Sequence, residues 1–288
     1  MKKRRKSKVF KKFSDASNSL NTPANFNIDK RSEKMKFAAL SSGSCGNCFY
    51  VRNGDNSVLI DAGLTCKQIK ERLSGLRQDS GKIKGIFVTH EHIDHIRGID
   101  VLSREFGIPV YATKGTLKAG LCREEDLLNE IKDDETIKLG GMEISAFSKS
   151  HDACQPVSYS ITNGKTISII TDVGYACKNI CEAVHDSNFL VMESNHDLQM
   201  LEEGPYPFFL KKRILGDKGH LSNLHSGLCV MEHASSKLKN IMLAHLSEIN
   251  NTPNLALTCF RNLVKERMDL KPRLMLSERN VSSGIINV

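Results

Sequence analysis

From residue 35 onward, short apolar runs alternate with polar turns, and this pattern predicts a strand-rich fold. We expect strands at residues 36–40, 48–52, 57–61, 84–89, 109–111, 136–139, 143–147, 157–161, 166–171, 189–192, 241–243 and 273–276. Apolar positions with helical spacing predict helices at residues 67–73, 96–106, 178–183, 224–234 and 254–268. Two sheets packed face to face, with helices outside, would accommodate this α+β mixture.

The composition is that of an ordinary soluble globular protein. Of the 288 residues, 40% are hydrophobic and 26% are charged. A chain of this length buries a large core without disulfide or metal staples, so we expect any bound metal to be catalytic rather than structural. We divide the chain into an N-terminal extension, residues 1–34, and one folded domain, residues 35–288.

The formal net charge of +8 resides in the extension. Residues 1–34 hold eleven Lys or Arg and three Asp or Glu, whereas residues 35–288 hold 30 of each sign. A segment of this composition is expected to be disordered. Two interpretations stay open: the extension adds sequence-independent attraction to nucleic-acid phosphates, or it is a solvated tail that precedes a true start at Met35.

The cysteines indicate a reducing compartment. The chain has nine Cys, an odd number, and shows no apolar run of signal-peptide or membrane-span length. We therefore expect reduced thiols, a cytoplasmic location and no membrane contact. Cys45 and Cys48 have the spacing of a redox or zinc pair, but no second pair accompanies them, so a tight turn explains them better.

Four ligand-type side chains follow the predicted strand 84–89 within six positions: His90, His92, Asp94 and His95. In an extended segment, residues i and i+2 point the same way, so the first two imidazoles can hold one cation together. The other two lie past the bend, at the start of a helix, and can hold a second cation. Imidazole and carboxylate ligands suit zinc, manganese or iron.

Three more ligand-type residues each follow an apolar run in the same way: His151, Asp172 and His245. Functional side chains concentrate on loops at strand ends, where a rigid scaffold positions them. One carboxylate such as Asp172 can bridge two cations about 3.5–4 Å apart. The sequence therefore predicts a centre for two divalent metal ions.

In their order along the chain, these seven residues resemble the ligand set of the metallo-β-lactamase superfamily. The resemblance implies an αββα sandwich of two mixed β-sheets flanked by helices. It also implies a first metal held by His90, His92 and His151, a second held by Asp94, His95 and His245, and Asp172 between them. Many zinc β-lactamases have Cys where this chain has Asp172, which argues against antibiotic hydrolysis.

A narrower resemblance rests on seven segments, at residues 42–47, 89–95, 150–153, 171–174, 193–197, 219–223 and 243–247. These segments look like the YycJ/WalJ group, bacterial cytoplasmic proteins linked to DNA processing. The resemblance implies 5′-to-3′ exonuclease activity and DNA as the partner. Two positions depart from the group, with Cys45 where Ser is usual and Val173 where Thr is usual.

Two bridged cations lower the pKa of a shared water, so that a metal-bridging hydroxide can attack a phosphodiester near neutral pH. We assign catalytic roles to Asp94 and Asp172, which hold the ions, and to His220 as general acid or phosphate contact. The alternative for His220 is that it packs against or caps the helix near Ser222.

Basic residues next to a Pro/aromatic segment, residues 204–209, suit a nucleic-acid strand. Our candidate substrate contacts are Lys211, Lys212, Arg213, Lys218, Ser222 and Asn223. The alternative is a solvated helix face with its aromatic residues in the core. Asp61 and His196, each near the end of a predicted strand, are candidates for supporting the metal ligands through hydrogen bonds.

Three functions compete. A nuclease is the leading interpretation. A small-molecule hydrolase on the same site, acting on a cyclic phosphate, lactone or thioester, is the first alternative, because fold does not determine substrate. A non-catalytic nucleic-acid-binding protein is the second, and the intact ligand set speaks against it. The folded domain is too short for the large inserted domain of the RNA-processing relatives, and homo-oligomerisation is left open.

Overall fold

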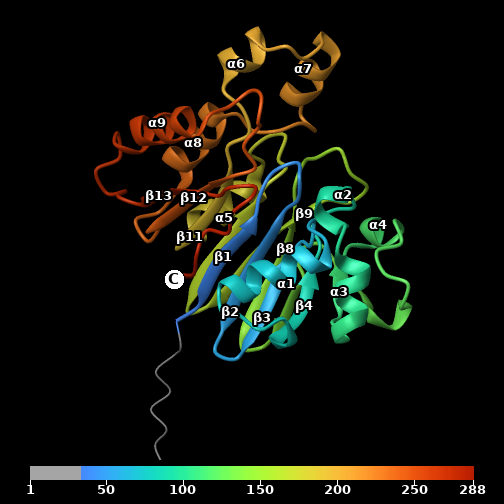
Figure 1. Ribbon diagram of the computed structural model, residues 1–288. Coiled ribbons are helices and arrows are strands. Elements are labelled where there is room, and N and C mark those ends of the chain that lie inside the picture. The colour runs from blue at the N-terminus through green and yellow to red at the C-terminus, as the bar shows by residue number, and fades with distance from the viewer. Residues whose placement is uncertain (1–33) are drawn as a thin grey trace, which may run out of the picture. The chain divides into compact units, whose positions relative to one another are not determined.

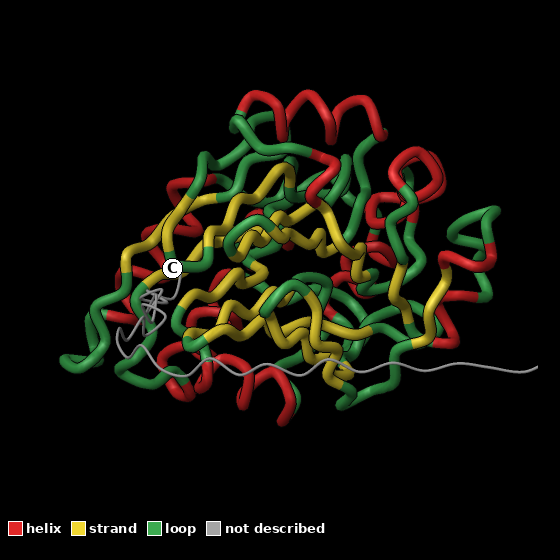
Figure 2. Tube along the Cα trace, turned by 90° about the horizontal axis from the view of Figure 1, so that it is seen from below, coloured by secondary structure: helices red, strands yellow, loops and turns green. Residues whose placement is uncertain are grey.

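Two seven-stranded sheets face each other and carry helices on their outer surfaces, in a computed structural model that describes residues 34–288 (Figures 1 and 2). This arrangement confirms the predicted α+β sandwich. The prediction of a disordered extension falls on residues 1–34 and so lies, apart from Lys34, outside the described residues. No helix within residues 34–288 is long and apolar enough to cross a membrane.

The first sheet is antiparallel at one edge and parallel at the other. The last strand of the chain pairs with the first, which places the C-terminus at this antiparallel edge. In spatial order the strands are β14 (Ile286–Asn287), β1 (Lys36–Ser41), β2 (Cys48–Asn53), β3 (Asn56–Ile60), β4 (Ile83–Phe87), β5 (Val110–Ala112) and β6 (Leu128–Glu130).

The second sheet repeats the mixture of an antiparallel meander and parallel strands. In spatial order its strands are β13 (Arg273–Leu276), β12 (Asn240–Ala244), β11 (Phe189–Glu193), β10 (Lys165–Ile170), β9 (Val157–Asn163), β8 (Met142–Ser148) and β7 (Thr136–Leu139). Strands β10 to β13 run parallel, so their carboxyl ends meet at one edge. That edge carries much of the candidate site.

Three apolar layers hold the sandwich together. The middle layer lies between the sheets, where the rings of Phe37 and Phe189, one from each sheet, have centroids 4.7 Å apart. The second lies under α1 (Cys66–Gly75) and α3 (Ile99–Phe106). The third lies under α5 (Lys178–Asp186), α8 (Asn223–His233) and α9 (Pro253–Val264). Burial of these faces supplies the main driving force for this fold.

The predicted helix 96–106 is wrong as a single element. The structure has α2 (Ile93–Ile96) and α3, separated by Arg97 and Gly98. Gly98 donates its backbone N–H to the carbonyl of Ala62, and a Cβ at this position would lie 2.2 Å from the carbonyl oxygen of Leu64. The chain therefore turns here, because only a glycine can approach the neighbouring loop so closely.

Other elements also differ from the prediction. The last predicted helix, 254–268, ends at Val264 as α9. Several short elements were not predicted: η1 (Ser80–Lys82), α4 (Lys114–Leu117), η2 (Glu125–Leu127), β6, α6 (Leu198–Glu203), α7 (Phe208–Leu215) and β14. In helix α7 three consecutive basic residues separate the apolar residues at its two ends, so the sequence shows only a weak helical period.

Candidate metal centre and active site

The candidate site lies where several strands end on the same edge of the sandwich. His90 follows β4, His151 follows β8, Asp172 follows β10 and His245 follows β12. All four side chains are buried, although they are polar. Burying polar side chains costs free energy unless their atoms find partners. This edge is therefore a candidate site for binding a charged or polar group.

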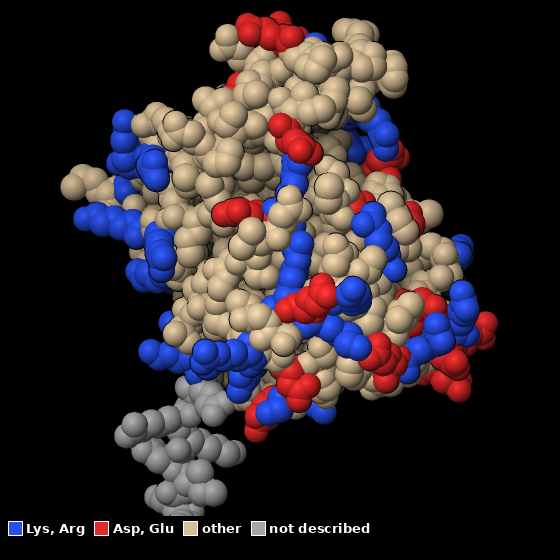
Figure 3. Space-filling model, viewed as in Figure 1, with Lys and Arg blue, Asp and Glu red and all other residues tan. Residues whose placement is uncertain are grey.

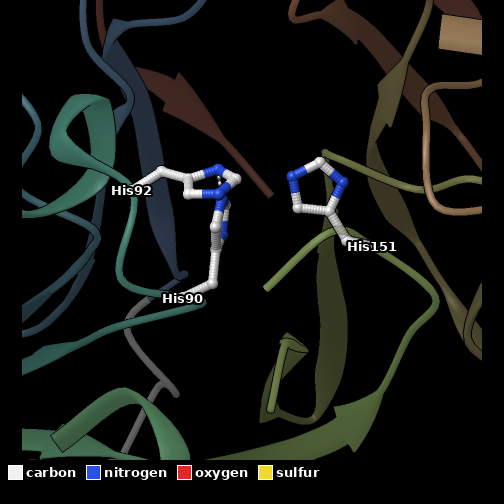
Figure 4. Close-up of side chains that lie close together, drawn as sticks. All are labelled: His90, His92 and His151. Atoms are coloured by element: carbon white, nitrogen blue, oxygen red, sulfur yellow. Dashed lines mark hydrogen bonds between the residues drawn. The ribbon is translucent and has the colours of Figure 1, made fainter. Parts of the chain in front are cut away.

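Three imidazoles form one compact group at this edge. His90, His92 and His151 each offer a ring nitrogen, and these atoms lie within 4.8 Å of one another. The Nε2 atom of His90 is 3.0 Å from Nδ1 of His92. Figure 4 shows the three rings turned toward one another across the space between the two loops. The structure thus brings together the three residues expected to share one metal.

Asp172 lies at the centre of the second group. One carboxylate oxygen, Oδ2, is 3.3 Å from Nε2 of His95, and the other, Oδ1, is 3.5 Å from Nε2 of His245. Oδ1 is also 3.9 Å from Nε2 of His151, in the first group. The side chain of Asp94 lines the same pocket, with Oδ2 3.7 Å from Nε2 of His95. Asp172 therefore lies between the two groups, as a bridging ligand would.

The protonation of His90, His151 and Asp172 suits metal binding. Burial lowers the pKa of His151 to about 4 and holds that of His90 well below its usual range. Burial tends to raise the pKa of Asp172, but the imidazoles of His245 and His95 outweigh it and hold that pKa well below its usual range. Neutral imidazole and ionised carboxylate are the forms in which these side chains bind metals.

Unpartnered atoms give an independent test of whether a cation fits. Nε2 of His151 and Oδ2 of Asp172 are buried and have no hydrogen-bond partner among residues 34–288. Leaving such atoms unpaired costs about 1–3 kcal/mol each. Both atoms belong to the His and carboxylate groups whose donor spacing fits a metal ion. These residues therefore fit divalent cations, and the donor set of imidazole and carboxylate is one that zinc, manganese and iron accept.

Asp61 lies against a candidate ligand, as the sequence predicted. Its Oδ2 atom is 2.7 Å from Nδ1 of His95, and its Oδ1 atom accepts the backbone N–H of Thr89 at 2.8 Å. The Thr89 hydroxyl donates to the same carboxylate at 2.9 Å. This fully buried carboxylate orients the His95 ring and presents its Nε2 atom to the site.

Glu193, at the end of β11, is the main residue that the sequence analysis missed. Its Oε1 atom lies 2.8 Å from Nδ1 of His220 and 2.9 Å from Nδ1 of His245. Its Oε2 atom accepts the backbone N–H groups of Val173 and Leu221. Burial tends to raise the pKa of Glu193, but the two imidazoles outweigh it and lower that pKa to about 2. The signal that could have identified Glu193 is a carboxylate at the end of an otherwise apolar strand.

His196 does not have the supporting role predicted for it. Its ring is buried, its Nδ1 atom contacts only Oδ1 of the adjacent Asn195, and the residue is absent from the pocket lining. Its backbone forms an isolated bridge with Ser222 instead. Asn47, which we did not single out, does contact the candidate ligands: its Nδ2 atom lies 3.0 Å from Nε2 of His95.

His220 lines the pocket beside the candidate ligands. Its Nδ1 atom is held by Glu193 and lies 3.8 Å from Oδ1 of Asp172. Burial tends to lower the pKa of His220, but the carboxylate of Glu193 outweighs it and raises that pKa. The helix near Ser222 is capped by Ser222 itself, whose hydroxyl accepts the N–H of His225, so His220 is not the cap.

The six candidate substrate contacts separate into three kinds. Arg213 and Lys218 line the pocket, and Arg213 donates to Oδ2 of Asp152 at 3.0 Å. Lys211 and Lys212 lie on the same helix but outside the pocket lining. The remaining two, Ser222 and Asn223, lie inside the protein.

Ser222 and Asn223 are buried and lie outside the pocket lining. The first caps α8, and the second exchanges side-chain hydrogen bonds with Ser194 and Asn251. Their polar atoms are used inside the protein, so they are removed from the candidate substrate contacts. The alternative that the neighbouring aromatic residues belong to the core is also wrong, since Phe208 and Phe209 are exposed.

Sequence comparison places the chain among known proteins. Residues 56–245 match the Beta-lactamase superfamily domain. The chain is 36% identical over 242 residues to the exodeoxyribonuclease YycJ of Bacillus anthracis, a match that covers 81% of this chain and 90% of that protein. It is 34% identical over 231 residues to the exodeoxyribonuclease WalJ of Streptococcus pneumoniae, covering 77% and 85%.

Structural comparison agrees on the fold. The metallo-beta-lactamase fold protein YhfI of Bacillus subtilis superposes with a TM-score of 0.66 at 14% identity, over 87% of this chain and 99% of that one. At such low identity the match speaks for the fold alone. The family match, the two sequence relatives and the fold together show that the chain belongs to the beta-lactamase superfamily and, within it, to the group of the YycJ and WalJ exodeoxyribonucleases.

Proposed function

We propose that this protein is a metal-dependent exodeoxyribonuclease that hydrolyses phosphodiester bonds of DNA in the 5′-to-3′ direction. The observation that carries the proposal is the Asp172-centred cluster of imidazoles, in a chain 36% identical to a protein named an exodeoxyribonuclease. A chain that spans 85–90% of such relatives has room for the same active domain.

Two divalent cations, zinc or manganese with iron as a third choice, would occupy the centre. His90, His92 and His151 would hold the first, Asp94, His95 and His245 the second, and Asp172 would lie between them. When bound, the two cations would lower the pKa of water and screen the charge of a phosphodiester. The support for two ions is that Asp172 contacts imidazoles of both groups.

The chain's own residues would bind the substrate and move a proton. Arg213 and Lys218, on the pocket wall, would hold the phosphate through charge-assisted hydrogen bonds. His220 would donate a proton from Nε2 to the leaving oxygen, because its Nδ1 atom is already held by Glu193. That contact determines the orientation of the ring, as the carboxylate does in other acid–base pairs.

The compartment is also part of the proposal. All nine cysteines are free thiols, which agrees with a reducing cytoplasm. Cys48 and Cys229 are buried, and burial raises the pKa of both thiols. Their protonated state makes them unreactive, so they would remain reduced there.

The test is a substrate panel. Purified protein is incubated with Mn²⁺ or Zn²⁺ and three substrates: DNA labelled at either end, bis-p-nitrophenyl phosphate, and a lactone. We expect release of nucleotides from the 5′ end and turnover of the small phosphodiester. Cleavage of the lactone alone would assign the site to small-molecule hydrolysis and overturn the proposal. Release from the 3′ end would overturn the polarity only.

A further inference from the structure

Two adjacent phenyl rings stand out in solvent at the start of α7. Phe208 is 81% exposed and Phe209 is 74% exposed, and helix α7 has no buried residue at all. Two large apolar rings left in solvent do not gain the free energy that their burial would provide. Exposed apolar patches of this kind mark binding surfaces. Helices α6 and α7 form a lobe (residues 198–215) that stands beyond the sheets, as Figure 1 shows.

The same helix also forms a wall of the candidate active site. Leu210, Arg213 and Ile214 line the pocket, together with Tyr206 just before the helix. Residues four apart lie on the same side of a helix, so Phe209 stands one turn above Arg213. Phe209 therefore lies beside the pocket-lining side of the helix, one turn from Arg213, and Phe208 precedes it in solvent.

Cations accompany the rings along the helix. Lys212 is four residues after Phe208 and is exposed, and Lys211 lies beside it. Each ring thus has a cation one turn further along the helix, Lys212 for Phe208 and Arg213 for Phe209, which provides apolar faces for bases and charges for phosphates. Figure 3 shows a lobe that is largely uncharged on the viewed face, with an acidic patch at its upper end, and charges of both signs elsewhere. The viewed face carries no broad basic patch.

The pocket itself is small. Its volume is about 250 Å³, below the roughly 300–1,000 Å³ usual for ligand pockets. A site of this size admits the scissile group and the end of one strand, not a length of duplex. The nucleotides next to the scissile bond must therefore lie outside the pocket, and the aromatic end of α7 adjoins its rim.

Building on the proposed exonuclease function, we infer that Phe208 and Phe209 form a stacking platform for unpaired bases of the strand that enters the pocket. Every base has a π face, so the platform accepts any sequence. It favours a DNA end whose bases are already unpaired, because the rings can stack only on bases released from the duplex. Substrate selection then depends on this helix, and the chemistry depends on the buried cluster.

The absence of Trp from the sequence allows a direct optical test. In Phe208→Trp the single indole reports on stacking, and we expect its fluorescence to be quenched by a phosphorothioate oligothymidine that resists cleavage. The matched control is Met268→Trp, at a side chain that is 90% exposed and also has basic neighbours, Lys265 and Arg267. The control should show no quenching at the same oligonucleotide concentration.

Kinetics supply the second test. In the double variant Phe208→Ala/Phe209→Ala, we expect KM for an oligonucleotide with an unpaired 5′ end to rise about tenfold or more, since stacked bases contribute strongly to single-strand binding. Turnover of bis-p-nitrophenyl phosphate, which has no bases, should stay within about twofold of wild type. The variant Phe208→Tyr/Phe209→Tyr should retain the wild-type KM. The control Met268→Ala should change neither the KM for the oligonucleotide nor the turnover of bis-p-nitrophenyl phosphate.

The outcomes separate the inference from the function on which it rests. If the wild type cleaves no DNA, the proposed function fails and the platform fails with it. If the wild type cleaves DNA and the double alanine variant has an unchanged KM, only the platform is overturned. If that variant instead changes a dimer into a monomer in sedimentation, with KM unchanged, the rings serve a second copy of the chain.

Discussion

Oε1 of Glu193 lies 2.8 Å from Nδ1 of His220, and the carboxylate is fully buried while the imidazole reaches the pocket. The same oxygen lies 2.9 Å from Nδ1 of His245. One carboxylate thus orients a candidate metal ligand and the candidate acid together. Its second oxygen accepts two backbone N–H groups, which hold it in place.

Replacing Glu193 by Gln should therefore impair catalysis without unfolding the protein. The amide has the same shape but cannot accept both imidazole protons as an ionised carboxylate does. We expect activity on bis-p-nitrophenyl phosphate to fall about 10- to 100-fold, as is usual when a group that supports metal ligands is lost. The control is Glu203→Gln, at an exposed residue of α6, which should keep full activity. Equal activities would contradict the positioning role.

Asp172→Asn should remove metal and activity together. The carboxylate contacts imidazoles of both groups, and an amide offers one neutral oxygen in place of the shared charge. Metal content by mass spectrometry and phosphodiester turnover are measured on the same preparation. Asp126→Asn, at an exposed acidic residue, is the control. Full turnover in Asp172→Asn would refute its central position in the site.

Chelation should destabilise the folded protein. A ligand that binds only the folded state at a thousandfold excess over its Kd stabilises it by about 4 kcal/mol. Oδ2 of Asp172 is buried and has no hydrogen-bond partner within residues 34–288, so a bound metal would be its partner and removal of the metal would leave it unpaired. We expect EDTA to lower the Tm, measured by calorimetry, by several degrees. Addition of Zn²⁺ or Mn²⁺ should restore it. A Tm that is unchanged by chelator and by added metal would argue against a metal centre.

Arg213 and Lys212 provide a matched pair on one helix. Arg213 lines the pocket, whereas Lys212 lies outside its lining. We expect Arg213→Ala to raise KM for bis-p-nitrophenyl phosphate about tenfold, because a hydrogen bond to a charged group contributes about 1.5–3 kcal/mol. Lys212→Ala should leave that KM unchanged and weaken only oligonucleotide binding, measured by anisotropy. A raised KM in Lys212→Ala with an unchanged KM in Arg213→Ala would show that the phosphate does not bind at Arg213.

Removal of residues 1–34 should leave the chemistry intact. Met35 must remain, because its side chain is buried and its carbonyl accepts the backbone N–H of Val288. We expect unchanged turnover of bis-p-nitrophenyl phosphate and a weaker, less salt-dependent affinity for DNA, since the extension holds the whole net charge. Loss of turnover on the small substrate would show that the extension belongs to the folded domain.

Much of this protein could be predicted from local sequence. Short runs of three to six residues predicted twelve strands within about two residues of their positions, and the two-sheet sandwich with them. The ligand-type residues could be found for the same reason: each follows an apolar strand directly, so strand and ligand are neighbours in the chain. His90, Asp172 and His245 all meet this local rule.

Tertiary structure alone decided that Glu193 supports His220 and His245. Glu193 meets its two imidazoles across 27 and 52 residues of chain, and a contact over such distances leaves no periodic trace in the sequence. Ser222 and Asn223 looked available for substrate, but packing buried both. A core position was the alternative for Phe208 and Phe209, and the lobe that carries them exposes both. Periodicity reports the residues along one element, whereas burial depends on elements that the chain brings together from far apart.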